Sequence, residues 1–375
     1  MHIVFISHEY PLWSPGGVGS FLQTIGRALV SNGHRVTIVG AGKSTHEEFL
    51  EDEGVQLFRL PKKKGILPAF VHNGLQLNKK LKEIYRGHPI DIIESAELGL
   101  ALLSGAHPAK KVIRLHGGHH FFAEAEKRGI NWRKGFLEKR SFKKADAFIA
   151  VSNYVKEHTG KFLSYHKKPL EIIPHPMDTA LEKPLVNEKT DHILFAGTVC
   201  EKKGVRQLIE AFKLVREKYP NKKLDIFGRD WFFPDGSSFI DMLKTTYDAS
   251  FFKQVLFHGS ISREELNLRY AEAAFCVFPS HMETQGLVTL EAMLFQKPVI
   301  FSQYGPGPET ITHLENGLLC DVYRPEDIAE KMIWCIENPN AAKTLGINAE
   351  ATVRAKYDKN SILERNLAFY SSLLP

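Results

Sequence analysis

The chain carries two alternating patterns of apolar and polar residues. Short apolar runs, such as residues 275–278, have the length of buried strands, whereas residues 21–31 space their apolar side chains three or four apart, as on one face of a helix. Strands are predicted at residues 2–7, 35–39, 55–59, 91–94, 112–115, 147–151, 192–196, 224–227, 255–257, 275–278, 299–302 and 318–320. Because helical segments separate these runs, the pattern predicts an α/β fold of βαβ units.

The alternation restarts after Pro184, which indicates two domains. A chain of 375 residues is also too long for one small core. The proline-containing stretch around Pro174 and Pro176 predicts a linker at residues 171–190, between a first domain at 1–170 and a second at 191–357.

Composition is ordinary for a soluble globular protein, with 43% hydrophobic and 25% charged residues. No apolar run has the length of a membrane span, and the first residues lack the basic start and long apolar core of a signal peptide. The four cysteines are widely spaced and form no CxxC pair, so neither a disulfide framework nor a zinc site is indicated. We therefore expect a cytoplasmic location.

A pair of carboxylates, Glu283 and Glu291, brackets a predicted loop and helix start that follow the strand at 275–278. Gly286 between them allows a ligand to approach the backbone, and the amides from Leu287 onward are suited to phosphate. A carboxylate one turn into the helix accepts hydrogen bonds well from a pair of sugar hydroxyls. This arrangement is typical of a nucleotide site.

The flanking residues Pro279, Ser280, Lys297 and Pro298 complete a motif that resembles the donor-sugar motif of the family 4 retaining glycosyltransferases. The resemblance covers nearly the whole chain. It implies the GT-B fold, which has two Rossmann-like domains facing across a cleft. The first domain would bind the acceptor, the second would bind the nucleotide sugar, and a final helix at about 358–375 would cross back onto the first domain. It also implies that Glu283 orients the transferred sugar and that Glu291 holds the ribose.

Cations for the donor diphosphate are expected after the first strand of the second domain. Lys203 matches the lysine of the family motif, but Thr198 stands where the family has an arginine. Arg229 follows the next strand, and parallel strands end at the same edge of a sheet, so we predict that Arg229 supplies the missing charge. Glu309 falls on a supporting glutamate of the family, and Gln285 replaces a usual aromatic residue.

In the first domain, Gly16 and Gly17 open the first helix and match a family loop that lies against the donor diphosphate. They are not part of a dinucleotide fingerprint, because Leu22 stands where the third glycine would be. His116 ends a strand and matches a family histidine near the anomeric carbon. His119 and His120 leave a metal site open as an alternative to a structural role.

The sequence thus predicts transfer of a hexose from a nucleotide diphosphate sugar to an acceptor hydroxyl, with retained configuration. No Asp-x-Asp motif occurs, so no metal and no further cofactor are expected. Two alternatives stay open: a non-hydrolysing sugar-nucleotide epimerase, which needs no acceptor, and a catalytically inactive protein that binds nucleotide sugars. A nicotinamide dehydrogenase is disfavoured by the broken glycine pattern.

Charge is unevenly distributed, with +9 over residues 1–190 and −3 over the remainder. The excess lies in residues 62–67, 79–82 and 127–144, the last interleaved with Trp132, Phe136 and Phe142. One interpretation is a solvated helix face whose aromatic residues pack inward. The other is attachment to an anionic membrane surface or a negatively charged acceptor. A glycan or lipid-linked acceptor fits the second, and no nucleic-acid module is recognisable.

Overall fold

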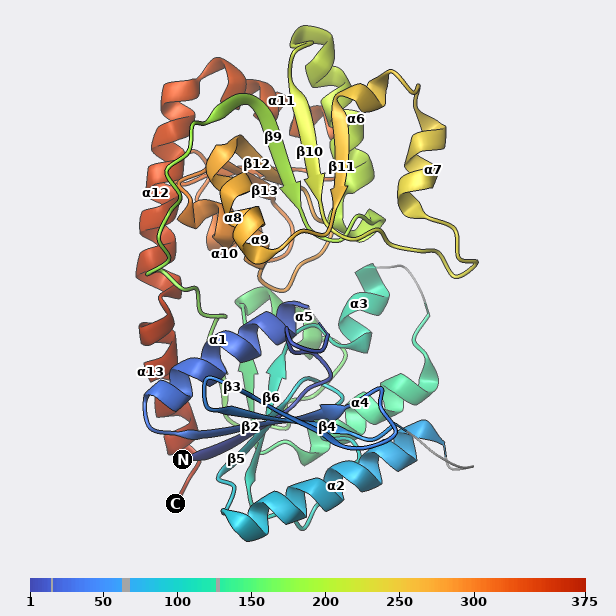
Figure 1. Ribbon diagram of the computed structural model, residues 1–375, viewed down its shortest axis with the longest axis vertical. Coiled ribbons are helices and arrows are strands. Elements are labelled where there is room, and N and C mark those ends of the chain that lie inside the picture. Colours follow the sequence, from blue (N-terminus) through green and yellow to red (C-terminus); the bar gives the residue numbers. More distant parts are fainter. Residues whose placement is uncertain (15, 63–67, 126–128) are drawn as a thin grey trace. The chain divides into compact units, whose positions relative to one another are not determined.

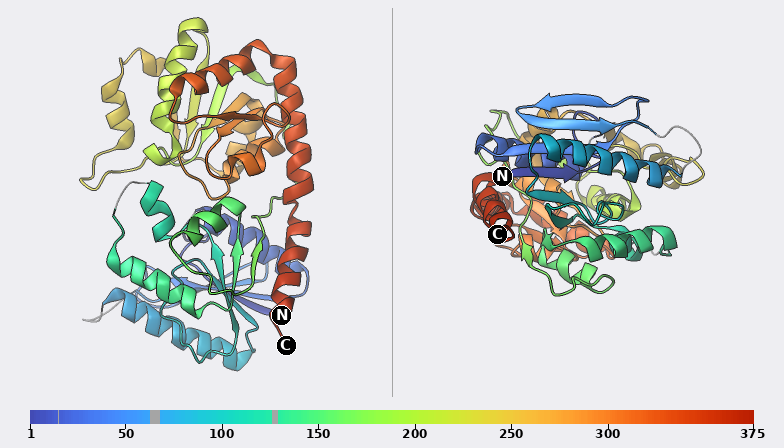
Figure 2. Two further views of the ribbon diagram at one scale, coloured as in Figure 1. Left: turned by 180° about the vertical axis from the view of Figure 1, so that it is seen from behind. Right: turned by 90° about the horizontal axis from the view of Figure 1, so that it is seen from below.

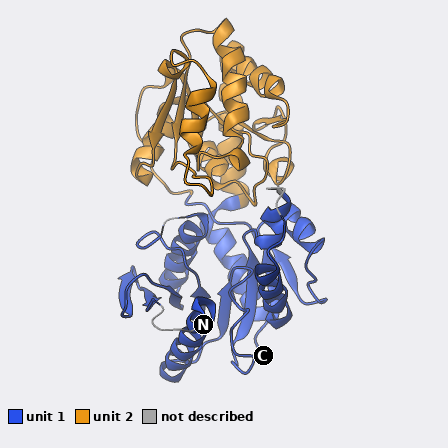
Figure 3. Ribbon diagram, turned by 90° about the vertical axis from the view of Figure 1, so that its right-hand side faces the viewer, with its two compact units in different colours: residues 1–178, 357–375 blue, residues 179–356 orange. Residues whose placement is uncertain are grey.

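The computed structural model describes residues 1–14, 16–62, 68–125 and 129–375. It divides into two compact units (Figure 3). Unit 1 contains residues 1–178 and 357–375, and unit 2 contains residues 179–356. Each unit is an α/β layer structure with its own, mainly parallel sheet, as the alternation of strand and helix patterns predicts.

The unit 1 sheet has the order β3-β4-β2-β1-β5-β6-β7-β8. Its strands are β1 His2–Ile6, β2 Arg35–Ala41, β3 Glu48–Asp52, β4 Val55–Leu60, β5 Ile92–Ser95, β6 Lys110–Leu115, β7 Ala147–Ala150 and β8 Leu170–Ile172. All neighbouring pairs are parallel except β3 with β4. The central strands are fully buried, which explains their nearly continuous apolar sequences.

Two strands of unit 1 were not predicted. β3 forms an antiparallel hairpin with β4 at the sheet edge, and its turn places Glu53 and Gly54 at positive φ. β8 pairs with β7 and uses residues that the sequence assigned partly to the linker. The boundary between the units falls after Asp178, and β9 of unit 2 already begins at Lys189. The connecting segment is therefore shorter than the predicted 171–190.

Six helices of the described part accompany this sheet. They are α1 Gly17–Ser31, α2 Ala69–Gly87, α3 His119–Ala125, α4 Trp132–Lys144, α5 Asn153–Gly160 and the C-terminal α13 Lys359–Ser372. Helix α13 packs against α1, and both chain termini lie near each other in this unit (Figure 2). Ile362, Phe369 and Tyr370 of α13 join the same buried cluster as Leu22 and Ile25 of α1.

A fully buried ionic network also ties α13 to the sheet. Arg114 of β6 donates from Nε to Glu94 of β5 at 2.7 Å, and the Tyr370 hydroxyl donates to the same carboxylate at 2.6 Å. Arg114 also contacts Asn366 of α13. A buried guanidinium is tolerated only when it is paired and hydrogen-bonded. The last helix is thus an integral part of unit 1.

The unit 2 sheet has the order β11-β10-β9-β12-β13-β14, and every neighbouring pair is parallel (Figure 1). Its strands are β9 Lys189–Ala196, β10 Lys223–Phe227, β11 Val255–Gly259, β12 Ala273–Phe278, β13 Val299–Ser302 and β14 Leu318–Cys320. Its helices are η1 Glu201–Lys203, α6 Val205–Lys218, α7 Phe239–Thr246, η2 Phe251–Lys253, α8 Arg263–Glu272, α9 Leu287–Leu294, α10 Gly307–Thr310, α11 Pro325–Glu337 and α12 Pro339–Tyr357. The strand order reverses between β9 and β12, where open α/β sheets bind their ligands.

Candidate functional site

The loops that follow β9 and β12 lie against each other at this switch point. Gly204 adopts a left-handed conformation (φ 70°), and a Cβ atom there would overlap the carbonyl oxygen of Pro279. The backbone of the two loops is also joined by a hydrogen bond from His281 N to Lys202 O at 2.9 Å. Close packing at a glycine therefore brings the segment of Lys203 beside that of Glu283.

Lys203 and Glu283, predicted from separate motifs, form an ion pair through Nζ and Oε1. Ser280 Oγ donates to the same carboxylate oxygen at 2.9 Å. Both side chains are largely buried, with 21% and 13% of their surfaces exposed. The structure thus brings together the lysine predicted to bind the diphosphate and the carboxylate predicted to orient the sugar, and both roles stay predictions.

Gly286 is the residue before α9 and has φ 79°, a region that favours glycine. It leaves the main-chain amides at the start of the helix, beginning with Leu287, without a capping side chain. Such amides are one of the standard partners of phosphate groups. The predicted phosphate role of Gly286 and Leu287 is therefore compatible with their conformation.

Glu291 lies one turn into α9 and is buried, with 7% of its surface exposed. Its carboxylate is held from α8: Arg263 Nη1 lies 2.6 Å from Oε1, and the Tyr270 hydroxyl donates to Oε2 at 3.2 Å. Neither α8 residue was identified from the sequence, because their contact with Glu291 arises only from the packing of α8 beside α9. A carboxylate has about four acceptor positions, so capacity remains for ribose hydroxyls.

Arg229 follows β10, directly beside the loop that carries Thr198. The strands β9 and β10 are paired as far as Ala196 and Phe227, and Val199 N donates to Arg229 O at 2.9 Å. The Arg229 side chain is exposed, and it makes no ion pair within the described part of the chain. Arg229 therefore lies beside the loop of Thr198, as the prediction for Arg229 requires. Its diphosphate role stays a prediction.

Glu309 lies in the short helix α10, which follows β13 at the same sheet edge. Its main-chain amide donates to Pro306 O at 3.1 Å. The structure thus places Glu309 after the strand next to β12, while its supporting role stays a prediction.

In unit 1, the side chain of Glu9 contacts the start of α1. Gly19 N donates to Glu9 Oε2 at 3.3 Å, and Gly16 lies against the same carboxylate. Glu9 thus lies where an anion would contact the helix start. The donor role assigned to Gly16 and Gly17 would require that carboxylate to move, and it stays a prediction.

His116 follows β6 and packs among aromatic rings. Its ring centroid lies 5.0 Å from that of His175 and 5.5 Å from that of Phe21. Burial, with a smaller contribution from the nearby Arg114 charge, lowers the pKa of His116 to about 3. The imidazole is therefore neutral at pH 7, and its buried Nδ1 has no hydrogen-bond partner among the described residues. His175 belongs to the same cluster, and its ring centroid lies 4.7 Å from that of Phe21.

The neighbouring histidines have structural partners. His120 Nδ1 contacts Glu138, and His119 Nε2 accepts a hydrogen bond from Asn131 N at 2.8 Å. Within the described ranges, no group of three or more His, Cys, Asp or Glu residues is arranged to hold a metal ion. The engaged ring nitrogens favour the structural alternative for His119 and His120.

Glu97 is a buried carboxyl that the sequence analysis did not single out. It accepts a hydrogen bond from Gly117 N at 2.8 Å, one residue after His116. Burial, to which the charge of Glu138 adds, raises the pKa of Glu97 to about 8. Carboxyls with strongly raised pKa values cluster at functional sites, which makes Glu97 a candidate ligand contact.

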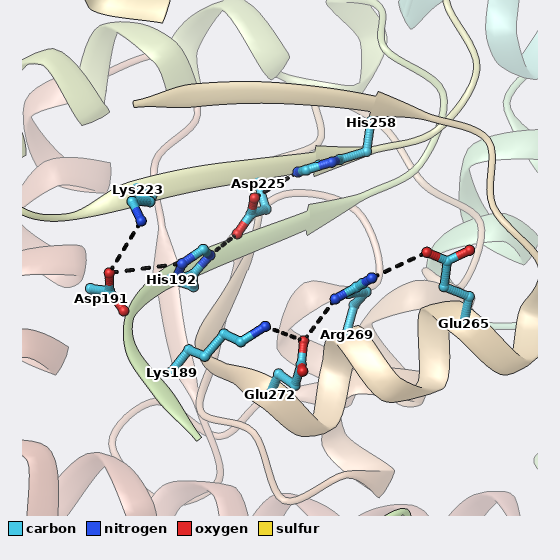
Figure 4. A network of polar contacts seen from close by, with 9 residues as sticks. All are labelled: Lys189, Asp191, His192, Lys223, Asp225, His258, Glu265, Arg269 and Glu272. Atoms are coloured by element: carbon cyan, nitrogen blue, oxygen red, sulfur yellow. Dashed lines mark hydrogen bonds and ion pairs between the residues drawn. The ribbon is translucent and has the colours of Figure 1, made fainter. Parts of the chain in front are cut away.

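A separate polar cluster lies between the unit 2 sheet and α8 (Figure 4). Asp225 of β10 bridges two histidines, contacting His192 of β9 and His258 Nε2 of β11, the latter at 2.6 Å. Arg269 and Glu272 of α8 face the same cavity of about 260 Å³. His192 and Asp225 lie within β9 and β10, before the carboxyl ends from which the donor loops leave, so this cluster is distinct from those loops.

Known glycosyltransferase families match both units of the chain. A family profile described as "Glycosyl transferases group 1" matches residues 177–352, and one described as "Glycosyltransferase Family 4" matches residues 15–181. The chain belongs to the family 4 glycosyltransferases, with two Rossmann-like halves of the GT-B type, and is a glycosyltransferase.

Individual relatives span almost the whole chain. D-inositol 3-phosphate glycosyltransferase of Pseudarthrobacter chlorophenolicus is 25% identical over 393 residues, covering 93% of this chain and 89% of the relative. The structure of sucrose-phosphate synthase from Thermosynechococcus elongatus superposes with a TM-score of 0.85 at 22% identity, covering 99% and 98% of the two chains. Anabaena HepE in complex with UDP-glucose gives 0.81 at 19% identity, covering 99% and 100%.

Proposed function

We propose that this glycosyltransferase moves a hexose from a nucleoside diphosphate sugar to an acceptor hydroxyl with retention of configuration. The observation that carries the proposal is the convergence of Lys203, Glu283, Gly286 and Glu291 at the switch point of unit 2. In a relative of the same fold, HepE, the ligand is UDP-glucose.

Each of these groups has a distinct task in the proposal. Lys203 and the amides after Gly286 stabilise the charge that develops on the departing diphosphate. Glu291, held by Arg263, accepts hydrogen bonds from the ribose hydroxyls. When the diphosphate binds Lys203, Glu283 loses its ion-pair partner, keeps the hydrogen bond from Ser280 and becomes available to a sugar hydroxyl. The departing phosphate oxygen takes the acceptor proton, so no protein nucleophile and no metal are assigned.

The first experiment is thermal unfolding with a panel of nucleoside diphosphates and their sugars. A ligand at about one hundred times its dissociation constant adds about 2.7 kcal/mol to the free energy of unfolding. We expect one nucleotide to raise the melting temperature of the wild type and to have a much smaller effect on Lys203→Ala. Lys213→Ala, an exposed lysine of α6, is the control and should respond like the wild type. No shift with any nucleotide would contradict the proposal.

Turnover separates the proposal from its alternatives. We expect the donor to be consumed rapidly only when an acceptor is present, and the anomeric proton coupling in the product to match that of the donor. An epimerase would convert the sugar nucleotide without any acceptor. An inactive binding protein would show the thermal shift without consuming the donor.

A cytoplasmic location at a membrane surface is part of the proposal, and helix α4 is the surface that supports it. Trp132 and Phe136 are exposed by 76% and 59%, and only Phe142 is buried, so the interpretation with all aromatics packed inward is wrong. The exposed Lys139 and Arg140 lie on the same helix. Basic and aromatic side chains together suit an anionic bilayer surface.

Not all of the predicted basic stretches contribute to this surface. Lys80 is buried and paired with Glu47 and Glu83. Residues 63–67, 127 and 128 lie outside the described residues. No helix of the described part is both long enough and apolar enough to span a bilayer.

Vesicle sedimentation tests this surface directly. We expect the wild type to sediment with vesicles that contain about 30% phosphatidylserine, because each basic residue near such a surface adds about 1 kcal/mol to the binding free energy. Trp132→Ala/Phe136→Ala should sediment much less. Phe49→Ala, which removes an exposed aromatic residue of β3, is the control. Equal sedimentation of both variants would contradict the membrane assignment.

A further inference from the structure

Unit 1 contains a cavity of about 580 Å³ at the carboxyl end of its sheet. It is bordered by the ends of β1, β2 and β5 and is covered by α2, α3 and α4. All of its lining residues belong to unit 1. The volume is in the range of small-molecule sites, roughly 300–1,000 Å³.

Apolar side chains form the larger part of the lining of this cavity, and the polar residues that also border it are Ser7, His8, Glu9, Asn73, Glu97, His119 and Lys134. Val18, Leu60, Leu77, Leu98, Phe122 and Leu137 supply much of it. A site for an extended glycan needs polar partners for many hydroxyl groups, because each buried hydroxyl without a hydrogen bond costs about 1–3 kcal/mol. The apolar walls therefore favour a ligand with an apolar ring or chain.

One side of the cavity carries a polar group that is suited to a hydroxyl. Glu97 lines it with 3% of its surface exposed, next to the loop of Gly117 and Gly118. Because the pKa of this buried carboxyl is raised to about 8, Glu97 is mainly neutral at pH 7. A neutral carboxyl both donates and accepts a hydrogen bond, and an apolar ligand beside it avoids the cost of burying a charge.

The helix that closes the cavity is also the helix with exposed aromatic residues. Leu137 and Lys134 of α4 line the cavity, while Trp132 and Phe136 of the same helix are exposed. Arg133 of α4 also lies over Phe70 of α2, 5.0 Å from its ring centroid, and Phe70 lines the cavity. The cavity is thus adjacent to the surface that suits a bilayer.

We propose that this cavity binds an amphiphilic acceptor, whose apolar ring or chain contacts the walls and whose hydroxyl hydrogen-bonds to Glu97. The inference rests on the proposed glycosyltransfer, since it identifies the class of molecule that receives the sugar. A lipid and a small hydrophobic glycoside share this chemistry.

The test measures binding of monomeric n-octyl β-D-glucoside, with maltose as the purely polar comparison. We expect octyl glucoside to bind at least ten-fold more tightly than maltose. Leu98→Arg places a charge in the cavity at a side chain that is 38% exposed, and it should weaken binding at least ten-fold. Leu50→Arg, at a 39% exposed leucine of β3 outside the cavity, should bind like the wild type.

Glu97 is tested with two substitutions of similar length. Glu97→Gln keeps a donor and an acceptor and should bind octyl glucoside within about three-fold of the wild type, a difference of about 0.7 kcal/mol. Glu97→Met lacks both and should lose most of the affinity. Equal binding of the two variants, or wild-type binding by Leu98→Arg, would overturn the proposal.

Nucleotide binding by the same variants separates this inference from the proposed function. Unit 2 should bind its nucleoside diphosphate equally well in Leu98→Arg, Glu97→Met and the wild type, and far-UV and near-UV circular dichroism should show that unit 1 of each variant is folded. Loss of octyl glucoside binding alone supports the cavity. Failure of nucleotide binding in the wild type would count against the proposed function and would leave the cavity result standing. Transfer to a glycolipid in vesicles, but not to octyl glucoside, would identify the lipid source.

Discussion

Arg263 Nη1 lies 2.6 Å from Glu291 Oε1, so the carboxylate assigned to the ribose is held by a guanidinium from the neighbouring helix. Coulombic attraction to Glu291 raises the pKa of Arg263. Tyr270, which is fully buried, donates to the other oxygen at 3.2 Å. The rotamer of Glu291 is thereby fixed before any ligand binds, which reduces the entropy lost on binding.

We predict that Arg263→Ala weakens nucleoside diphosphate binding about three- to ten-fold, or about 0.7–1.4 kcal/mol, because Glu291 loses one of its two anchors. Isothermal titration measures the effect. The control is the 2′-deoxynucleotide, which lacks one ribose hydroxyl. With this ligand the variant and the wild type should differ much less. An equal loss with both ligands would mean that Arg263 acts elsewhere.

Arg229→Ala tests whether this residue replaces the arginine that the family has at the position of Thr198. The side chain is exposed beside the Thr198 loop, so its loss should weaken diphosphate binding about ten-fold, or about 1.4 kcal/mol, with little change in the free energy of unfolding. Binding of the corresponding nucleoside should be unchanged, since it has no phosphate. The exposed Lys213→Ala serves as the control for a general loss of positive charge, and equal effects of the two variants would contradict the assignment.

The strands were predictable wherever burial on both faces made their sequences apolar, as in β5 and β12. The edge strand β3 was missed because it contributes little to the core: Phe49 and Leu50 are exposed by 52% and 39%. Strand β8 was missed because it has only three residues, all partly exposed. Both strands form because they hydrogen-bond to a neighbouring strand, and the local sequence pattern does not identify that neighbour.

The residues of the candidate site also fall into a group that the sequence predicts and a group that it does not. Lys203, Glu283 and Gly286 lie in local motifs, and the structure brings Lys203 and Glu283 into contact. Arg263 and Glu97 carry no local motif. Arg263 contacts Glu291, which lies 28 residues later in the sequence, and Glu97 contacts Gly117, which lies 20 residues later. Such contacts depend on helix and loop packing that a single sequence does not specify.

Glu97 should make the stability of the protein depend on pH. Its pKa is about 8 in the folded protein against an ordinary value of 4.5, so the folded state holds more protons than the unfolded state between these values. Stability is therefore fully present below about pH 4.5 and is lost as the pH rises towards 8. At pH 7 the loss is on the order of 3 kcal/mol.

Glu97→Gln removes this titration while keeping the shape of the side chain. Relative to the wild type, the variant should gain stability as the pH rises from 5 to 8, which urea unfolding at several pH values measures. Glu157→Gln, at an exposed position of α5, provides the control for removing one negative charge. A stability difference between Glu97→Gln and wild type that stays constant with pH would contradict the raised pKa.

Asp225 should stabilise unit 2 without contributing to nucleotide binding. It is 8% exposed and accepts hydrogen bonds from His192 and His258, so Asp225→Ala leaves two partly buried rings without their shared partner. We expect a loss of about 2–3 kcal/mol. Asp225→Asn, which still accepts one hydrogen bond, should lose less, and Glu264→Ala at an exposed position of α8 should lose almost nothing. Chemical denaturation measures the order of the three variants. At temperatures where all three variants are folded, their nucleotide affinities should equal that of the wild type, because Asp225 lies within β10 and away from the donor loops. A selective loss of affinity in Asp225→Ala would instead connect the cluster to the donor site.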